Sequence, residues 1–261
     1  ISKRAVEDIN SLPFFRVSGN YYEISLKIGQ KFKDQIQAAF KESSLLKKRF
    51  EWDDKDPYRV DHAEFLTKKR FPNYMEEIKG IAEGAEVEYR KILVANFMHL
   101  PEVPDCSSLL FQKTDTSNEN INSFIVHNED HEWGLGYYSY LVHIDYPNGN
   151  SILAHCYPGI IPGLSFCFNS YGIIMTCNYI PDPEPKLGIP RVIIGRWIID
   201  ADCLDVARSR AREIVPRSGG VNYNLSSINT KSLLSIETSS DDYSTIEVKD
   251  KFFHPNHYIS P

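Results

Sequence analysis

The sequence lacks several features that mark large classes of protein. No stretch approaches the roughly 20 consecutive apolar residues that a membrane-spanning helix requires, so we expect a soluble protein without a membrane span. Basic residues do not outnumber acidic ones, with 29 Lys and Arg against 35 Asp and Glu. This balance argues against a nucleic-acid partner, which would select a basic surface. The chain begins at Ile1 without a methionine, so both a cytoplasmic protein and one exported after removal of a signal stay open.

Cysteines are few, and their spacing matches no known framework. There are 5 of them, an odd number, and no two are separated as in a CxxC pair. The sequence therefore predicts neither a disulfide scaffold nor a structural zinc site, and it gives no reason to expect a metal or another cofactor. Cys156, Cys167 and Cys177 lie in apolar runs that are typical of buried small residues, and Cys203 is similar. Cys106 differs, because an acid precedes it and two serines follow it.

Residues 20–100 have the pattern of helices. Apolar side chains recur every three or four residues from Tyr21 to Phe40, again at about 60–70, after Pro72, and from Tyr89 to Leu100. The charged run Asp53–Pro57 is typical of a loop. Gly80 and Gly84 are poor helix formers four residues apart, which predicts a close crossing with another helix or a helix end.

After Cys106 the apolar period changes to two, which is typical of strands. A hairpin signal stands at Pro147–Asn150. Helical patterns return only at about 190–200 and 204–215. The predicted strands are 108–111, 123–127, 137–145, 151–157, 164–168, 173–177, 221–228, 233–237, 244–248 and 252–259. Antiparallel strands with a central pair of helices predict an α+β fold in which sheet packs on sheet and helices lie outside. The 42% of hydrophobic residues suffices for a sizeable core.

Polar clusters interrupt the ends of three predicted strands. They are His127–Asp130, Asn178-Tyr179 and His254–His257. A single polar cluster at a strand end is usually a turn. Three such clusters together with a cysteine at the boundary between helical and stranded residues indicate a candidate catalytic site.

These residues carry a resemblance to a known family. Their order resembles that of the acyl-coenzyme A:6-aminopenicillanate acyltransferase family, whose members are N-terminal-nucleophile hydrolases related to the choloylglycine hydrolases. The segments that carry the resemblance are Arg16–Gly29, Gly80–Ala85, Asp105–Ser108, Asn128-x-Asp130, Phe168–Tyr179, Gly188–Arg191 and His254–His257.

The resemblance implies an αββα sandwich of the N-terminal-nucleophile type with a helical N-terminal segment. It implies a precursor that cuts itself between Asp105 and Cys106 into a helical piece, 1–105, and a catalytic piece, 106–261, which stay associated. Cys106 then matches the nucleophile, Asp130 the acid, Asn256 the oxyanion-hole amide and Asn178 a second oxyanion or substrate contact. Ser107, Asn128 and Tyr179 stand beside these residues as supporting positions.

The implied chemistry is consistent with these residue types. The new α-amine of Cys106 would have a pKa of about 8 and would act as the base for its own thiol. Attack on a non-peptide amide of a small N-acyl substrate would give a thioester. Water would then complete hydrolysis, and a second amine would complete acyl transfer. Aromatic residues are available for an apolar pocket: Tyr137, Tyr138, Phe166, Phe168, Tyr179 and Trp197.

The chain departs from the family pattern at three places. Ser107 stands where relatives usually have threonine, and Glu129 where they often have a large apolar or aromatic residue. Relatives also continue beyond the His254–His257 segment with further elements that include a site arginine. We therefore expect a C-terminal part beyond Pro261, and we assign that arginine to no residue.

Two other functions stay open. A papain-like protease would pair Cys106 with His127, His155 or His254, although the glycine and aromatic signature of that family is absent around Cys106. A non-catalytic binding protein that keeps the fold is the other alternative.

Overall fold

A computed structural model describes residues 12–97, 106–115, 120–130, 132–213, 217–230 and 232–260. The predicted cleavage partner Asp105 lies outside the described residues. The fold is α+β, with helices and strands divided along the chain as the apolar periods predict.

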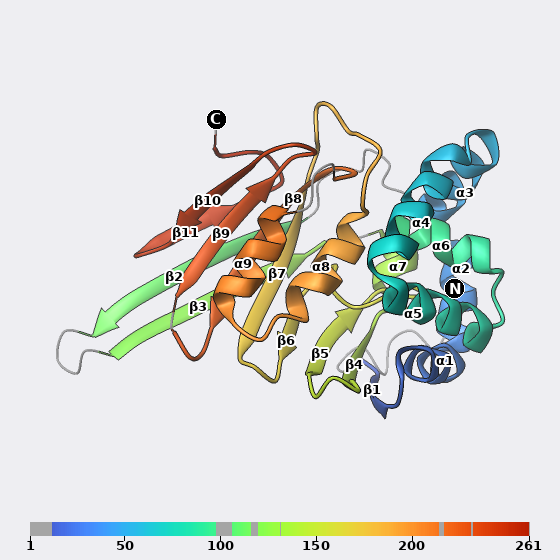
Figure 1. Ribbon diagram of the computed structural model, residues 1–261, viewed down its shortest axis with the longest axis horizontal. Helices are drawn as coiled ribbons and strands as arrows, with labels where there is room; N and C mark the ends of the chain where they lie inside the picture. The colour runs from blue at the N-terminus through green and yellow to red at the C-terminus, as the bar shows by residue number, and fades with distance from the viewer. Residues whose placement is uncertain are drawn as a thin grey trace.

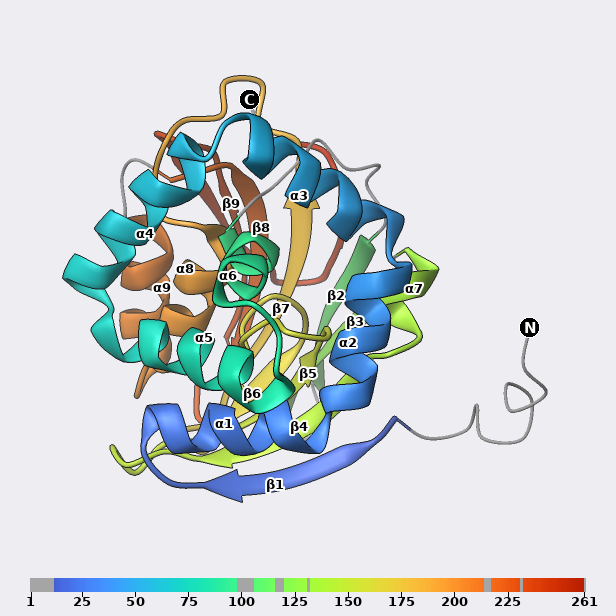
Figure 2. The same cartoon turned by 90° about the vertical axis from the view of Figure 1, so that its right-hand side faces the viewer.

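Six helices make up most of the N-terminal part and surround one end of the sheets (Figure 2). A short strand, β1 (Phe14–Ser18), precedes them. The helices are α1 (Tyr21–Lys31), α2 (Lys33–Glu42), α3 (Ser44–Lys55), α4 (Tyr58–Arg70), α5 (Pro72–Ala85) and α6 (Tyr89–Phe97). Asn20 caps α1 by accepting a hydrogen bond from the backbone N–H of Glu23, whose carboxylate returns one to Asn20.

The predicted helix crossing at Gly80 and Gly84 is confirmed. Helices α1 and α5 pack so closely that an added Cβ on Gly80 would lie 2.5 Å from the carbonyl oxygen of Tyr22. One on Gly29, in the facing helix, would lie 2.6 Å from the carbonyl oxygen of Ile81. Glycine is therefore required on both helices where their backbones meet.

The predicted loop at Asp53–Pro57 is wrong for its first part, because α3 continues to Lys55. The reason is tertiary: Arg90 of α6 binds both carboxylate oxygens of Asp53 at 2.6 Å. Asp53 is buried by this contact. A charged run that looks like a loop is thus held in a helix by an ion pair with a distant residue.

The strands form two sheets. The larger one has eight strands in the order β1-β4-β5-β6-β7-β8-β9-β10, antiparallel except for the β1–β4 pair. Its other strands are β4 (Tyr140–Asp145), β5 (Ser151–Cys156), β6 (Cys167–Asn169), β7 (Ile173–Ile180), β8 (Gly220–Ser227), β9 (Leu233–Thr238) and β10 (Tyr243–Glu247). The β4–β5 connection is the hairpin that Pro147–Asn150 predicts.

The smaller sheet has three strands in the order β11-β2-β3. These are β11 (Lys251–His254), β2 (Cys106–Asp115) and β3 (Asn120–Glu129). Its inner face contacts the large sheet through β7 and through a small cluster of Leu110, Leu233 and Val248. Helices α8 (Arg191–Ile199) and α9 (Leu204–Glu213) cover the other face of the large sheet (Figure 1). The result is helix layer, large sheet and small sheet in that order.

Several predicted boundaries shift. The predicted strand 137–145 begins only at Tyr140, because Trp133–Gly136 form a short helix, α7, that the sequence pattern does not predict. The last predicted strand, 252–259, ends at His254. Within the described residues, no helix has the length and apolar character needed to cross a membrane.

Candidate active site

Cys106 is the first residue of β2, and strand alternation decides what it faces. Side chains of a strand point alternately to opposite faces. Cys106 and Ser108 therefore point from β2 toward the large sheet, and His127 and Glu129 do so from β3. The register pairs Cys106 with Glu129 and Ser108 with His127. Four polar side chains thus meet on the inner face of the small sheet.

The Cys106 thiol contacts the carboxylate of Glu129. Its sulfur lies 3.6 Å from Glu129 Oε1, so the thiol donates a hydrogen bond to that oxygen. Further donors hold the same carboxylate: Tyr157 Oη donates to Oε1 at 2.6 Å, and Ser165 Oγ to Oε2 at 2.6 Å. Glu129 is consequently fixed from several directions while one of its oxygens faces the sulfur.

A chain of hydrogen bonds connects Glu129 to the interior. His127 Nε2 lies 2.7 Å from Glu129 Oε2, and His127 Nδ1 lies 2.9 Å from Ser108 Oγ. Ser108 donates its only proton to Asn178 Oδ1 at 2.7 Å, and Asn178 Nδ2 donates to the backbone oxygen of His254 at 2.9 Å. Asn178 is fully buried by these contacts. The structure therefore places Asn178 in a link between the two sheets.

The hydrogen bonds of His127 orient its ring. A carboxylate only accepts, so Nε2 carries a proton toward Glu129. Ser108 uses its own proton on Asn178 Oδ1, and its oxygen faces His127 Nδ1. His127 thus connects the Glu129 carboxylate to the Ser108–Asn178 pair.

The surroundings act in opposite directions on the two titrating groups. Burial disfavours the Glu129 charge. The hydrogen bond and charge of His127, together with the hydrogen bonds from Ser165 and Tyr157, nevertheless lower the pKa of Glu129 to about 2. Burial and then the Glu129 charge raise the pKa of the Cys106 thiol well above its usual value. The Arg191 cation and a backbone hydrogen bond from Asp130 offset part of that rise. The resting pair is a thiol beside a carboxylate.

Asn256 lies at the backbone of Cys106. Its Oδ1 accepts a hydrogen bond from the Cys106 N–H at 2.7 Å, and its Nδ2 donates to the Tyr179 carbonyl oxygen at 2.7 Å. A backbone N–H only donates and a carbonyl only accepts, so the orientation of the amide is fixed. Asn256 thus holds the nitrogen of the predicted scissile bond, and its role as an oxyanion donor stays a prediction.

Asp130 reaches Cys106 through its backbone, as noted above. Its exposed carboxylate accepts a hydrogen bond from Asn128 Nδ2. Ser107 pairs opposite Asn128 in the β2–β3 register and is partly buried. The predicted acid and two supporting residues therefore lie beside Cys106 and Glu129 in the paired strands β2 and β3, and their chemical roles stay predictions.

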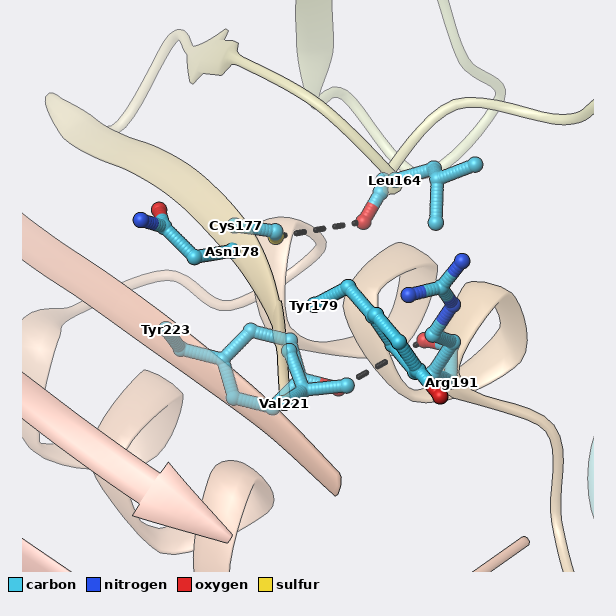
Figure 3. Close-up of a pocket in the computed structure, with 8 residues that line it drawn as sticks. Leu164, Cys177, Asn178, Tyr179, Arg191, Val221 and Tyr223 are labelled. Carbon is cyan, nitrogen blue, oxygen red and sulfur yellow. Dashed lines mark hydrogen bonds between the residues drawn. The ribbon is translucent and has the colours of Figure 1, made fainter. Parts of the chain in front are cut away.

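Arg191, the first residue of α8, brings a cation to the region. It is buried, and its guanidinium lies 4.7 Å from the ring centroid of Tyr179. Figure 3 shows the two side chains against each other at a hollow of about 10 Å³, large enough for a single water. This arginine lies inside the Gly188–Arg191 segment that carries the resemblance.

A larger hollow of about 400 Å³ opens beside Glu129. Its described lining joins the end of β3 to α7 and β5: Glu129, Asp130, Trp133, Gly136, Tyr137, Ser139, His155 and Tyr157. Of the aromatic residues expected in a pocket, Tyr137 lines this hollow and Tyr179 the smaller one. Trp197 instead packs on Phe71 at the helical side.

Of the described residues, one group has ligand atoms close enough for a metal: Cys106, His127 and Glu129, within 4.8 Å of one another. The His127–Glu129 contact at 2.7 Å is direct, and Tyr157 and Ser165 occupy further positions on the carboxylate. These are the contacts of a hydrogen-bond network, in which each ligand atom is already paired.

His254 and His155, the other two bases of the papain-like alternative, contact other groups. His254 Nε2 lies 2.7 Å from Glu237 Oε1, and burial lowers the His254 pKa. His155 stacks on Phe166. The group that contacts the Cys106 sulfur is a carboxylate, an arrangement different from the Cys/His pair of the papain-like alternative.

Sequence reasoning missed several residues of the site. Strand period two would have added Ser108 to the predicted cluster of His127 and Glu129, because all three share the face of Cys106 once β2 and β3 are paired. Tyr157 and Ser165 come from other segments, and no local pattern marks them. Arg191 lies in the Gly188–Arg191 segment that carries the resemblance, but the sequence analysis assigned it no role.

Two comparisons bear on identity. A model of the family described as acyl-coenzyme A:6-aminopenicillanic acid acyl-transferase matches residues 116–261, more than half of the chain. A β-alanyl-dopamine/carcinine hydrolase of Drosophila melanogaster is 27% identical over 221 residues, covering 76% of this chain and 56% of the relative. The chain thus spans little more than half the length of that relative. The family match includes Glu129, Asp130, Asn178 and Asn256 and begins after Cys106.

Proposed function

Because the chain belongs to the acyl-coenzyme A:6-aminopenicillanic acid acyl-transferase family, we propose that it is a self-processing amide hydrolase or acyltransferase with Cys106 as its nucleophile. One observation carries the proposal. Cys106 is the residue where a strand begins, its thiol is held by Glu129 and its backbone nitrogen is held by Asn256. A nucleophile and the nitrogen of the bond to be cut are thus positioned in one residue.

The fold proposed for this function is the αββα sandwich, with residues 1–105 as the helical piece and 106–261 as part of the catalytic piece. The apolar outer face of the small sheet is an argument for a second helical layer in this fold. Phe124, Val126 and Phe253 point outward there, and each is at least 56% exposed. Apolar side chains on one face of a sheet are normally covered by another layer.

Self-cleavage uses the groups already in place. The Cys106 sulfur attacks the carbonyl carbon of residue 105, and the carbonyl electron pair moves to oxygen. Collapse breaks the C–N bond, the thiol proton passes to the departing nitrogen, and a thioester remains. Water then adds to the thioester carbonyl, which restores the thiol and leaves a carboxylate on residue 105.

Turnover repeats this chemistry on an external amide. The new α-amine of Cys106 has a pKa of about 8 and accepts the thiol proton. In this proposal Asp130 binds that amine, Asn256 Nδ2 turns from Tyr179 to the oxyanion, and Asn178 supports the strand that carries Tyr179. An oxyanion donor of this kind typically contributes about 10²–10³ in rate.

The proposed substrate is a small N-acyl amide. The relative's name gives β-alanyl-dopamine and carcinine as its substrates, and both are amides of small amines. The hollow beside Glu129 has aromatic walls and two carboxylates at its end, which suits a small amine or an aromatic group.

Mass spectrometry of the purified full-length protein tests the proposal. We expect one fragment that begins at Cys106, and we expect Cys106→Ala to remain whole. Cys203→Ala serves as the matched control, because Cys203 is an exposed cysteine outside the site, and it should cut like the wild type.

Incubation of the cut protein with N-acyl amides should release the amine, with or without transfer of the acyl group to an added amine. A wild-type protein that stays whole and leaves these amides intact would refute the proposal. Cleavage that continues in Cys106→Ala would refute the assignment of the nucleophile.

A further inference from the structure

Glu129 is the residue at the thiol that the family resemblance does not explain, since relatives often have an apolar side chain there. We propose that Glu129 positions the Cys106 thiol and keeps it protonated until cleavage gives residue 106 an amino group. The inference rests on the proposed function for its second half. Its first half, the coupling of Glu129 to the thiol, stands on the contacts alone.

The geometry makes Glu129 a rigid acceptor. Tyr157, Ser165 and His127 each hold one of its oxygens at 2.6–2.7 Å, and its side chain is only 19% exposed. Such a carboxylate cannot rotate away without breaking several charge-assisted hydrogen bonds. The thiol hydrogen therefore has a fixed acceptor, and the sulfur lone pairs keep a defined direction.

The same geometry opposes a thiolate. A sulfur anion at 3.6 Å from Glu129 Oε1 would lose its hydrogen bond and meet a negative charge in a partly buried site. Four other titratable or charged groups face the sulfur. They are His127 in β3, Tyr157 directly after β5, Cys177 in β7 and Arg191 in α8. The Arg191 cation offsets part of the repulsion.

Cleavage changes this balance at residue 106 itself. In the continuous chain the Cys106 nitrogen is a neutral amide that donates to Asn256. After cleavage it becomes an amine that is positively charged when protonated and that lies one side chain away from the sulfur. A cation there compensates the Glu129 charge, so the thiolate becomes accessible only in the cut protein. Glu129 would thus limit the thiolate to the processed form, whereas self-cleavage starts from the thiol, whose proton passes to the departing nitrogen.

The pH dependence of alkylation tests the inference. The full-length protein is treated with iodoacetamide at several pH values, and Cys106 modification is read by peptide mass spectrometry, separately for the uncut junction peptide and the peptide that begins at Cys106. In Glu129→Gln, the midpoint for Cys106 should fall by about one to two pH units in whichever form is populated. In the wild type, the cut form should react at lower pH than the uncut form.

Two controls isolate the effect. Cys203 is exposed, and its profile should be the same in all variants. Glu237→Gln breaks another Glu–His contact of 2.7 Å, that with His254, without touching Cys106, and it should leave the Cys106 midpoint unchanged.

The outcomes separate the inference from the proposed function. An unchanged or higher midpoint in a folded Glu129→Gln protein overturns the role of Glu129, even if the protein cuts itself. A wild-type protein that never cuts overturns the proposed function, while the shift in the uncut form still tests the coupling. If Glu129→Gln does not fold, Glu129→Asp retracts the carboxylate from the sulfur and should lower the midpoint by a smaller amount. No change in that folded variant also overturns the coupling.

Discussion

The side chain of Asn256 accepts a 2.7 Å hydrogen bond from the backbone N–H of Cys106, across 150 residues of the chain. The contact joins the segment after β11 to the start of β2, and these two strands pair as antiparallel neighbours. Its other amide group binds the Tyr179 carbonyl at the end of β7. Asn256 therefore connects the small sheet to the large one at the nitrogen of the proposed scissile bond.

Substitutions at Asn256 can separate its two groups. Asn256→Ala removes both the acceptor and the donor, while Asn256→Asp keeps an acceptor for the Cys106 N–H. We expect turnover of an amide substrate to fall about 10²–10³-fold in both, because each loses the oxyanion donor. Self-cleavage should survive better in Asn256→Asp than in Asn256→Ala. Mass spectrometry over time measures cleavage, and amine release measures turnover. Equal cleavage in the two variants would contradict a role for the acceptor.

The depressed pKa of Glu129 predicts an acid-dependent loss of stability. Its pKa is about 2 in the folded chain against 4.5 for the free group. A lowered carboxyl pKa contributes stability that is complete above the unfolded value and is lost as pH falls from about 4.5 toward 2. The contribution at neutral pH is on the order of 3 kcal/mol. Urea unfolding at pH 5, 3 and 2 measures it.

The comparison for that prediction is Glu129→Gln, which has no carboxylate to protonate. Its free energy of unfolding should be lower than that of the wild type at pH 5, and the two should approach each other near pH 2. Curves that stay parallel from pH 5 to pH 2 would contradict the assignment of the acid sensitivity to Glu129.

Local sequence patterns predicted the elements well and their partners poorly. Apolar spacing placed α4 within about two residues and the start of α5 at Pro72, and the glycines of α5 indicated a crossing with another helix, which is α1. Each pattern reflects contacts within a few residues. The pairing of β11 with β2 joins segments far apart in the chain, and no local pattern contains that information.

The candidate site shows the same limit at single-residue scale. The family resemblance directed attention to Asp130, whereas Glu129 is the residue whose side chain contacts the thiol. Neighbours in a strand point to opposite faces, so a shift of one residue changes which acid meets the sulfur. Only the register of β2 against β3 decides between them. Cys106 and Asn256, in contrast, are in direct contact in the structure.

A buried ion pair between α5 and α8 should be the main polar contribution to stability between the helical piece and the rest. Arg196 binds Glu77 at 3.0 Å, and both side chains are at most 1% exposed. Glu77→Gln leaves the buried guanidinium with the more distant Asp200 carboxylate, at 3.8 Å, as its counter-charge and should lower the free energy of unfolding by about 3–5 kcal/mol. Denaturant unfolding of the two proteins measures the difference.

The matched control is the exposed pair between Arg70 and Glu213, whose N–O distance is 2.8 Å. Its side chains are 44% and 54% exposed, so water screens the attraction. Glu213→Gln should change the free energy of unfolding by less than about 1 kcal/mol. Similar effects for the two substitutions would show that burial does not determine the contribution of these pairs.

The contact between α1 and α5 predicts an unusual cost for a small substitution. Gly80→Ala would normally favour a helix by up to about 1 kcal/mol. Here the new Cβ would lie 2.5 Å from the Tyr22 carbonyl oxygen and 2.8 Å from the Leu26 nitrogen, both backbone atoms that cannot rotate away. The helices must separate, and we expect a loss of about 1–3 kcal/mol, measured as a lower midpoint of thermal unfolding.

Gly219→Ala is the control for that prediction, since no atom lies within 4 Å of the position of its Cβ. Its backbone torsions also lie outside the region that requires glycine, because its φ is not among the positive values. The unfolding midpoint should therefore stay the same or rise, as the unfolded chain loses freedom without a new clash. A midpoint that is unchanged in Gly80→Ala as well would mean that the two helices adjust without cost. In that case the glycines permit the close crossing, but the crossing tolerates alanine at this position.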